Sequence, residues 1–274
     1  MPIALVIRAA GTNCDAEMAR GFEMAGARAT LAHVDALIAD PSIIDGFDLI
    51  GFPGGFSYGD DIASGRIMAV KVREKLWPAL RDAARRGCAM IGICNGFQTM
   101  VQIGLLPGPG AGEGWPEGAP PPQRVALRDN IGARYMDRWV PIEPDAKSVC
   151  VWTKGLSELY AANPSARRDV LQLPVGHGEG RFLADSESTL VELRRNGQVA
   201  LRYGDNFNGS QDSIAGICDS TGRIFGLMPH PDRFLDWTRH QHWTRLAASV
   251  RTGDTPGLMM FKNAVAAVAR VGSR

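Results

Sequence analysis

Short apolar runs and segments with helical spacing alternate over the first hundred residues of the chain. Apolar runs, partly β-branched, predict buried strands at 3–7, 29–33, 47–52 and 88–94. Apolar residues three or four positions apart predict helices at 14–25, 67–86 and 95–105. This alternation is typical of a doubly wound sheet. We therefore predict an α/β fold: an open, mostly parallel sheet with helices on both faces.

Two local signals refine these boundaries. Thr12 or Asn13 is expected to cap the first helix, because either side chain can accept a hydrogen bond from a backbone N–H. Pro78 falls inside the helix at 67–86 and lacks a backbone N–H, so we expect a kink or a break there.

The second half of the chain contains shorter apolar runs separated by turn residues. Candidate strands lie at 125–127, 139–142, 149–152, 171–175, 199–203, 214–218 and 224–228, and an amphipathic helix at 258–271. A Gly/Pro-rich segment at about 107–122 precedes them, and we interpret it as a poorly ordered surface excursion. Because the runs after it resemble more sheet, residues 1–274 are predicted to form a single domain.

The composition gives no sign of a charged partner. The 274 residues are 45% hydrophobic with a net charge of +1, so neither nucleic acid nor a membrane surface is expected to bind. The five cysteines form no C-x-x-C pair, and a reducing compartment fits better than a disulfide framework. The N-terminal apolar run is too short for a signal peptide, and no run is long enough for a membrane span. We therefore expect a cytoplasmic protein.

The candidate nucleophile is Cys94, where an apolar run ends and a helical segment begins. Gly92 and Gly96 flank it in the pattern G-x-C-x-G, and small residues there permit the sharp strand-to-helix turn of a nucleophile elbow. The positive end of the following helix favours the thiolate. A buried core cysteine is the alternative interpretation.

A glycine pair can supply donors to this site. Gly54 and Gly55 follow a predicted strand, in the segment PGGFSYGD at 53–60. Their backbone N–H groups can approach a ligand closely and, with the N–H of Asn95, stabilise an oxyanion. A simple tight turn is the alternative.

A histidine and an acid can complete the site. His230 and Asp232 follow another predicted strand, and residues two apart in an extended segment point the same way. The carboxylate can then orient an imidazole that accepts the cysteine proton. A solvated loop histidine is the alternative, and His177 is a rival base.

Other groups carry less weight. His240 and His242 are ligand types, but no cysteine or acidic cluster completes a zinc site around them. The pair at 60–61, Asp-Asp, could bind a cation, although a loop cap is the simpler interpretation. The sequence contains neither a P-loop nor a G-x-G-x-x-G fingerprint. We therefore predict no metal site and no cofactor in this chain.

Six segments together resemble one family. They are GTNCD (11–15), PGGFSYGD (53–60), GICNGFQ (92–98), VGHGEGRF (175–182), NGSQDSIAG (208–216) and MPHPDR (228–233). In this order, and over nearly the whole chain, they resemble the glutamine amidotransferase subunits of phosphoribosylformylglycinamidine synthase, which are class I glutamine amidotransferases.

The resemblance implies a fold, a reaction and partners. The fold is an open, flavodoxin-like α/β sheet. The reaction is hydrolysis of glutamine to glutamate and ammonia through a cysteine thioester. The ammonia passes to a separate synthetase subunit, which uses ATP and magnesium to convert formylglycinamide ribonucleotide into formylglycinamidine ribonucleotide in purine synthesis. A small third subunit often joins the complex.

The resemblance also implies catalytic roles. Cys94 matches the family's nucleophile and His230 its general base, while Gly54 and Gly55 match the oxyanion glycines. Asp232 stands where the family usually has glutamate, and its carboxylate reaches about 1.5 Å less far.

Further positions match the family's substrate contacts. Gln98 matches a residue that contacts the amino-acid end of the substrate, and Asn208, Gly209 and Ser210 match a loop whose backbone does likewise. Two other functions stay open on sequence alone. One is another cysteine hydrolase on a similar sheet, peptidase-like or deglycase-like, and the other is a non-catalytic binding module.

Overall fold

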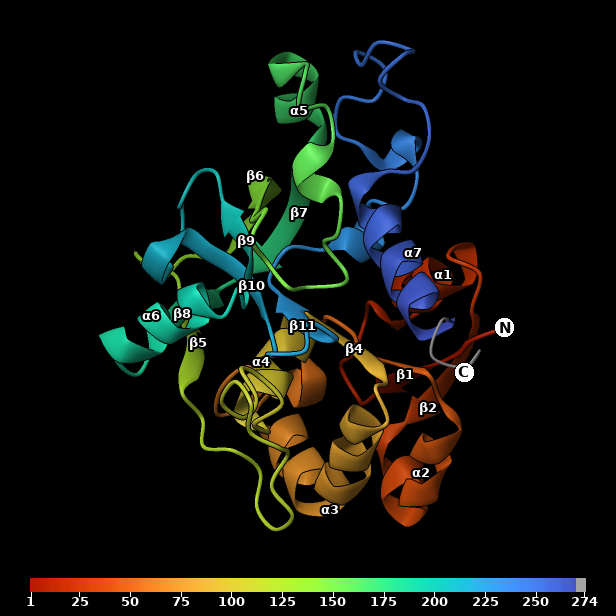
Figure 1. The fold of residues 1–274 in the computed structure, drawn as a ribbon, viewed down its shortest axis with the longest axis vertical. Helices are drawn as coiled ribbons and strands as arrows, with labels where there is room; N and C mark the ends of the chain where they lie inside the picture. Colours follow the sequence, from red (N-terminus) through yellow and green to blue (C-terminus); the bar gives the residue numbers. More distant parts are fainter. Residues whose placement is uncertain (270–274) are drawn as a thin grey trace.

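The structure is a computed structural model that describes residues 1–269 and is organised around one nine-stranded sheet (Figure 1). The strands of this sheet are β1 (Ile3–Arg8), β2 (Arg28–His33), β3 (Leu49–Phe52), β4 (Ala89–Ile93), β6 (Met136–Pro144), β7 (Gln172–His177), β9 (Val199–Tyr203), β10 (Ile214–Cys218) and β11 (Ile224–Leu227). A separate two-stranded sheet pairs β5 (Val125–Asp129) with β8 (Glu179–Ala184).

The large sheet has the order β2-β1-β3-β4-β11-β10-β9-β6-β7. The first five strands pair in parallel, and the remaining pairs are antiparallel. All strands except β10 and β6 consequently run in the same direction. The predicted α/β fold with an open, mostly parallel sheet is confirmed.

Helices cover both faces of this sheet. They are α1 (Asp15–Met24), α2 (Val34–Ala39), α3 (Arg66–Arg85), α4 (Asn95–Gln102), α5 (Pro164–Val170), α6 (Glu187–Arg195) and α7 (Pro256–Ala269). On one face α1 packs against α7, and on the other α3 packs against α4 (Figure 1). Every residue of β3 and β4 is therefore buried, as the continuous apolar runs predict.

The Gly/Pro-rich segment at about 107–122 contains neither helix nor strand. It is nevertheless fastened to α3, because Trp115 packs on Trp77 with ring centroids 5.9 Å apart. Arg85 also donates hydrogen bonds to Glu117 and to the carbonyl of Trp115. Strands that precede this segment in the sequence and strands that follow it belong to the same large sheet. That continuity supports the single-domain organisation, which stays a proposal.

Of the kink or break predicted at Pro78, the break is wrong, because α3 is continuous from Arg66 to Arg85. Pro78 lies on the exposed side of the helix. The carbonyl that loses its partner there can hydrogen-bond to water, so the helix tolerates the proline.

The predicted cap of the first helix is also wrong. Cys14 occupies the N-cap of α1, and no side chain caps it. The hydroxyl of Thr12 accepts the N–H of Ala9 instead, and Oδ1 of Asn13 accepts a hydrogen bond from the thiol of Cys14. Both candidate side chains are therefore occupied within the turn.

One further sequence prediction is wrong, and several elements were not predicted. Residues 149–152 form no strand, because the N–H groups of Val149 and Val151 reach single carbonyls of two different turns, at Gly197 and Gly222. The helices α2, α5 and α6 and the strand β8 are not predicted. The last helix, predicted at 258–271, is α7; positions 270 and 271 lie outside the described residues.

None of the helices within residues 1–269 combines the length and apolarity needed to cross a bilayer.

Near the end of β4, α4 makes its tightest contact with the sheet at Gly96. A Cβ on this residue would stand 1.8 Å from the carbonyl oxygen of Phe52 in β3. Only glycine allows α4 to lie this close to the sheet.

We expect Gly96→Ala to destabilise the chain by about 1–3 kcal/mol, because the added methyl group overlaps backbone that cannot move freely. Urea denaturation measures the change. Gly118→Ala is the matched control, since a Cβ there meets no atom within 4 Å. Its effect is expected to stay within about 0.5 kcal/mol. Equal stability of the two variants would contradict the close contact at Gly96.

Candidate active site

Cys94 occupies the turn between β4 and α4, with φ 53° and ψ −110°. A non-glycine residue in such a conformation is strained by about 1–3 kcal/mol, which is the backbone geometry expected of a nucleophile elbow. Gly92 permits the turn, because a Cβ there would stand 2.4 Å from the sulfur of Met100. The free N–H groups at the start of α4 lie next to Cys94 and favour negative charge on its sulfur.

The glycine pair of the 53–60 loop lies beside this turn. A Cβ on Gly54 would stand 2.6 Å from Cε1 of His230 and 3.4 Å from Cβ of Cys94. Gly55 has φ +136°, and a Cβ there would stand 2.7 Å from the backbone nitrogen of Asn13. Glycine is therefore required at both positions, and the backbone of the loop faces the candidate nucleophile.

The side chain of Asn95 fastens this loop to the start of α4. Its Oδ1 accepts the N–H of Ser57 at 3.2 Å, and its Nδ2 donates to Oδ1 of Asp60 at 2.8 Å. The carboxylate of Asp60 also accepts the N–H of Gly65, so it caps the segment before α3, and burial raises its pKa. The N–H of Asn95, at the first position of α4, has no partner within the helix. Together with the N–H of Gly55, it suits an oxyanion hole.

His230 and Asp232 lie on one short turn and hydrogen-bond to each other. Nδ1 of His230 is 3.1 Å from Oδ1 of Asp232, and each residue is only 2% exposed. The extended segment predicted here is wrong, since Pro231–Arg233 forms a 3-10 turn. This curvature brings the short carboxylate within reach of the imidazole, at the long end of the normal N–H···O range.

Protonation of His230 depends on this carboxylate. Burial lowers the pKa of His230, but the charge of Asp232 and hydrogen bonds with Asp232, Cys14 and Cys94 outweigh burial and raise the pKa well above its ordinary value. An imidazolium cannot accept a further proton. The arrangement therefore fits a resting imidazolium at His230, beside the sulfur of Cys94.

His177, the rival base, lines the same small cavity as Cys94. The amide nitrogen of Asn130 donates to two backbone carbonyls, so its Oδ1 is the atom that faces His177. Because Oδ1 only accepts, Nδ1 of His177 carries the proton and donates to it at 3.1 Å. Burial and the charge of His230 lower the pKa of His177 to about 3. So weak a base accepts a thiol proton poorly, and His230 is the better candidate.

The cavity beside Cys94 has a volume of about 20 Å³, which suits roughly one water molecule. The connection between β7 and β8 covers it. Sγ of Cys94 lies 3.7 Å from the carbonyl oxygen of Gly176, and Nε2 of Gln98 donates to the carbonyl of Glu179. A space of this size does not hold a whole amino acid.

Gln98 lines this cavity, as predicted from the sequence. Among the described residues 1–269, the loop at 208–210 is not part of the lining. Nδ2 of Asn208 donates to the carbonyl of Gly180 at 2.9 Å, and the hydroxyl of Ser210 accepts the N–H of Phe182 at 3.0 Å. Gly209, at φ +78°, forms the turn between them. The loop thus fastens β8, and its contact with substrate stays a prediction.

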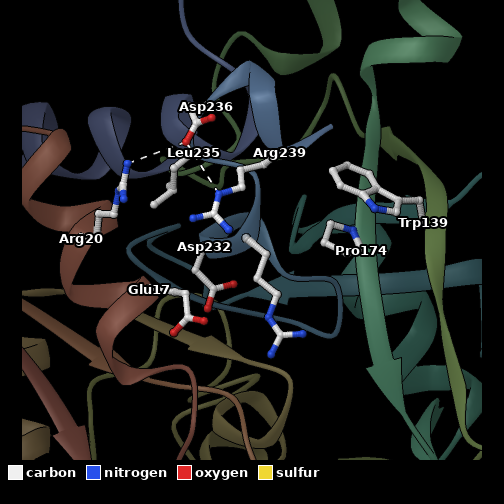
Figure 2. Close-up of a pocket in the computed structure, with 9 residues that line it drawn as sticks. Glu17, Arg20, Trp139, Pro174, Asp232, Leu235, Asp236 and Arg239 are labelled. Carbon is white, nitrogen blue, oxygen red and sulfur yellow. Dashed lines mark ion pairs between the residues drawn. The ribbon is translucent and has the colours of Figure 1, made fainter. Parts of the chain in front are cut away.

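A second pocket, of about 350 Å³, adjoins the candidate site from another side (Figure 2). Both Asp232 and Arg233 line it, together with residues from α1, β6 and β7. Asp236 forms ion pairs with two arginines of this lining, drawn as dashed lines in Figure 2. Cys94 is not part of the lining, so this pocket adjoins the site at Asp232 and Arg233.

Cys14 belongs to the site and was missed by sequence reasoning as a functional residue. Its sulfur lies within 4.8 Å of ligand atoms of His230 and Asp232. The guanidinium group of Arg233 donates to this sulfur at 3.1 Å. The only sequence signal is its place in the GTNCD segment.

The assembled groups suit one type of chemistry. A cysteine at a strained helix N-terminus lies beside an imidazole that a carboxylate orients. Gly55 lines the same cavity as this cysteine, and Asn95 follows it in the chain. This combination can attack the carbonyl carbon of an amide or ester, hold the oxyanion and form a thioester.

Comparisons with known proteins agree on one family. Residues 1–268 match the family model of the CobB/CobQ-like glutamine amidotransferase domain. Phosphoribosylformylglycinamidine synthase subunit PurQ of Dehalococcoides mccartyi is 39% identical over 267 residues, 95% of each chain. The protein of the same name from Methanococcus maripaludis is 39% identical over 285 residues, 97% of each chain. The solved structure of PurLQS from Thermotoga maritima contains a chain with a TM-score of 0.67 and 27% identity, over 97% of this chain and 98% of that one.

We expect the stability of the chain to depend on pH through His230. A histidine whose pKa is raised by folding stabilises the fold fully below its unfolded pKa of 6.5, and this contribution is lost as pH rises through the folded pKa. The wild-type chain should therefore lose more unfolding free energy between about pH 6 and about pH 9 than His230→Gln does. Urea denaturation at both pH values measures the losses, and equal losses would contradict the raised pKa.

Proposed function

The chain belongs to the family of CobB/CobQ-like glutamine amidotransferase domains, and we propose that it is the glutaminase subunit of a phosphoribosylformylglycinamidine synthase. It hydrolyses glutamine to glutamate and ammonia and supplies the ammonia for the conversion of formylglycinamide ribonucleotide into formylglycinamidine ribonucleotide in purine synthesis. The observation that carries this proposal is the strained Cys94 beside the His230–Asp232 pair, in a chain that is 39% identical to PurQ subunits over almost its full length.

The first half of the reaction forms a thioester. The thiolate of Cys94 attacks the side-chain amide carbon of glutamine, and the N–H groups of Gly55 and Asn95 hold the oxyanion. Loss of one such donor costs about 10²–10³ in rate in other acyl transfers. The imidazolium of His230 protonates the leaving nitrogen, and ammonia departs.

The second half regenerates the enzyme. His230 is now neutral, and it takes a proton from the water that attacks the thioester carbonyl. The oxyanion collapses, glutamate leaves, and the sulfur departs as a thiolate beside a protonated His230. Asp232 keeps the imidazole oriented through its hydrogen bond to Nδ1 in both halves.

Substrate binding requires the connection between β7 and β8 to open. In this structure the side-chain amide of Gln98 donates a hydrogen bond to the carbonyl of Glu179. Once that connection moves, the amide of Gln98 becomes available to the amino-acid end of glutamine. The loop of Asn208, Gly209 and Ser210 fastens β8 at the base of the same connection and contributes backbone contacts to that end of the substrate.

The proposal includes partners that the chain itself does not contain. A synthetase subunit receives the ammonia, and ATP and magnesium act on that subunit. A small third subunit joins the complex, which is cytoplasmic. The related Thermotoga maritima structure is that of PurLQS, and the related PurQ proteins are named as subunits of the synthase, which supports an assembly of this kind.

The proposal predicts that Cys94→Ala separates the two nitrogen sources. In the complex reconstituted with the synthetase subunit, glutamine-dependent synthesis should fall by at least about 10³-fold, because the nucleophile is lost. Ammonia-dependent synthesis should stay at the wild-type rate. A coupled assay with either nitrogen source measures both rates. Cys88→Ala is the matched control, because Cys88 is a buried thiol just before the opposite end of β4.

Two outcomes would count against this function. Full glutamine-dependent synthesis by Cys94→Ala would rule out Cys94 as the nucleophile. Hydrolysis of peptides in preference to glutamine by the wild-type chain would favour a peptidase-like hydrolase instead.

A further prediction concerns the carboxylate. Asp232→Asn should lower kcat by about 10- to 100-fold less than His230→Gln does, since an orienting acid is more dispensable than the base that moves the proton. Steady-state glutaminase kinetics of both variants in the complex test this order. A larger loss in Asp232→Asn would assign the carboxylate a direct part in proton transfer.

A further inference from the structure

Cys14, His230 and Asp232 present three different metal ligands to one point. One atom from each residue, a sulfur, a nitrogen and a carboxylate oxygen, lies within 4.8 Å of the other two, and all three residues are buried. The ligands come from opposite ends of the chain. Their spacing in the sequence therefore predicts no metal site, and the fold alone brings them together.

One oxygen of this cluster lacks a hydrogen bond. Oδ2 of Asp232 is buried and has no partner within residues 1–269, whereas Oδ1 accepts from His230. A buried polar atom without a partner costs about 1–3 kcal/mol. A cation bound by both oxygens of this carboxylate would satisfy Oδ2.

The sulfur of Cys14 lies where negative charge is stabilised. Cys14 is the N-cap of α1, a helix of ten residues, so the positive end of that helix points at it. The guanidinium group of Arg233 donates to the sulfur at 3.1 Å. The thiol of Cys14 also donates to Oδ1 of Asn13 at 3.1 Å, so binding of a metal ion releases that proton.

We propose that Cys14, His230 and Asp232 form an inhibitory site for Zn²⁺. Zinc prefers sulfur, imidazole nitrogen and carboxylate oxygen in tetrahedral geometry. Nδ1 of His230 and Oδ1 of Asp232 are 3.1 Å apart. Two tetrahedral ligands at zinc distances lie about 3.4 Å apart. The ion therefore takes the place of the proton that these two atoms share, and the thiolate and carboxylate neutralise its charge.

Zinc at Nδ1 would remove the general base. The remaining imidazole proton must then reside on Nε2, so His230 cannot accept a proton from Cys94 or from water. The pocket of Figure 2 is lined by Asp232 and Arg233 and so adjoins the three ligands, whose carboxylate is itself buried. The inhibition rests on the proposed function, whereas the binding of zinc does not.

Zinc binding to the full, reduced chain tests the proposal directly. The chain is stripped of metal and titrated with Zn²⁺ in competition with a chromophoric chelator. We expect one tightly bound zinc per chain and a loss of affinity of at least about 100-fold in Cys14→Ser, because a direct ligand matters more than its supporting contacts. Cys88→Ser should bind like the wild type. Absence of bound zinc, or equal affinity in Cys14→Ser, would overturn the proposal.

Cobalt identifies the sulfur ligand. Co²⁺ in this site should show a thiolate-to-metal charge-transfer band in the wild type and in Cys94→Ser but not in Cys14→Ser. Loss of the band in Cys94→Ser alone would assign the metal to the nucleophile and overturn the proposal. Asp232→Asn provides a second ligand variant should Cys14→Ser fail to fold, and it too should weaken zinc binding. These measurements use no glutamine, so a failure here is separate from a failure of the glutaminase assignment.

Discussion

The strained backbone at Cys94 is the constraint on which the rest of the site depends. The turn survives only because α4 lies directly on the sheet, where a Cβ on Gly96 would overlap the carbonyl of Phe52. It is also held by Asn95, whose side chain bonds to Ser57 and Asp60 of the glycine loop. One residue thus fixes both the nucleophile's helix and the loop that supplies the oxyanion donors.

The second constraint is the short carboxylate of Asp232. An aspartate reaches less far than a glutamate would, yet its hydrogen bond to His230 forms at 3.1 Å. The 3-10 turn Pro231–Arg233 curves the backbone, and the N–H of His230 is held by the carbonyl of Pro174 at 2.8 Å. Backbone geometry therefore compensates for the missing methylene. The same compact turn leaves Oδ2 without a partner and brings Arg233 against Cys14.

Sequence patterns predict the parts of this molecule that depend on local order. The apolar runs of β3 and β4 predict fully buried strands, and glycine spacing predicts the elbow at Cys94. The helix α6 also has sequence signals that could have predicted it, because Ser186 caps its start and Arg194 and Arg195 lie in its last turn. Sequence patterns fail to predict secondary structure where contacts between residues far apart in the chain determine it. Residues 149–152 are apolar but bond to two separate turns, and β8 exists only because β5 pairs with it. No spacing rule brings Cys14 next to His230.

The central claim is that Cys94, and not the neighbouring Cys14, attacks glutamine. Treatment of the complex with an electrophilic glutamine analogue, followed by mass spectrometry of the digested chain, tests it most directly. The account predicts one adduct on the peptide that contains Cys94, with loss of glutamine-dependent activity and retention of ammonia-dependent activity. An adduct on Cys14, or full inactivation with Cys94 unmodified, would contradict it.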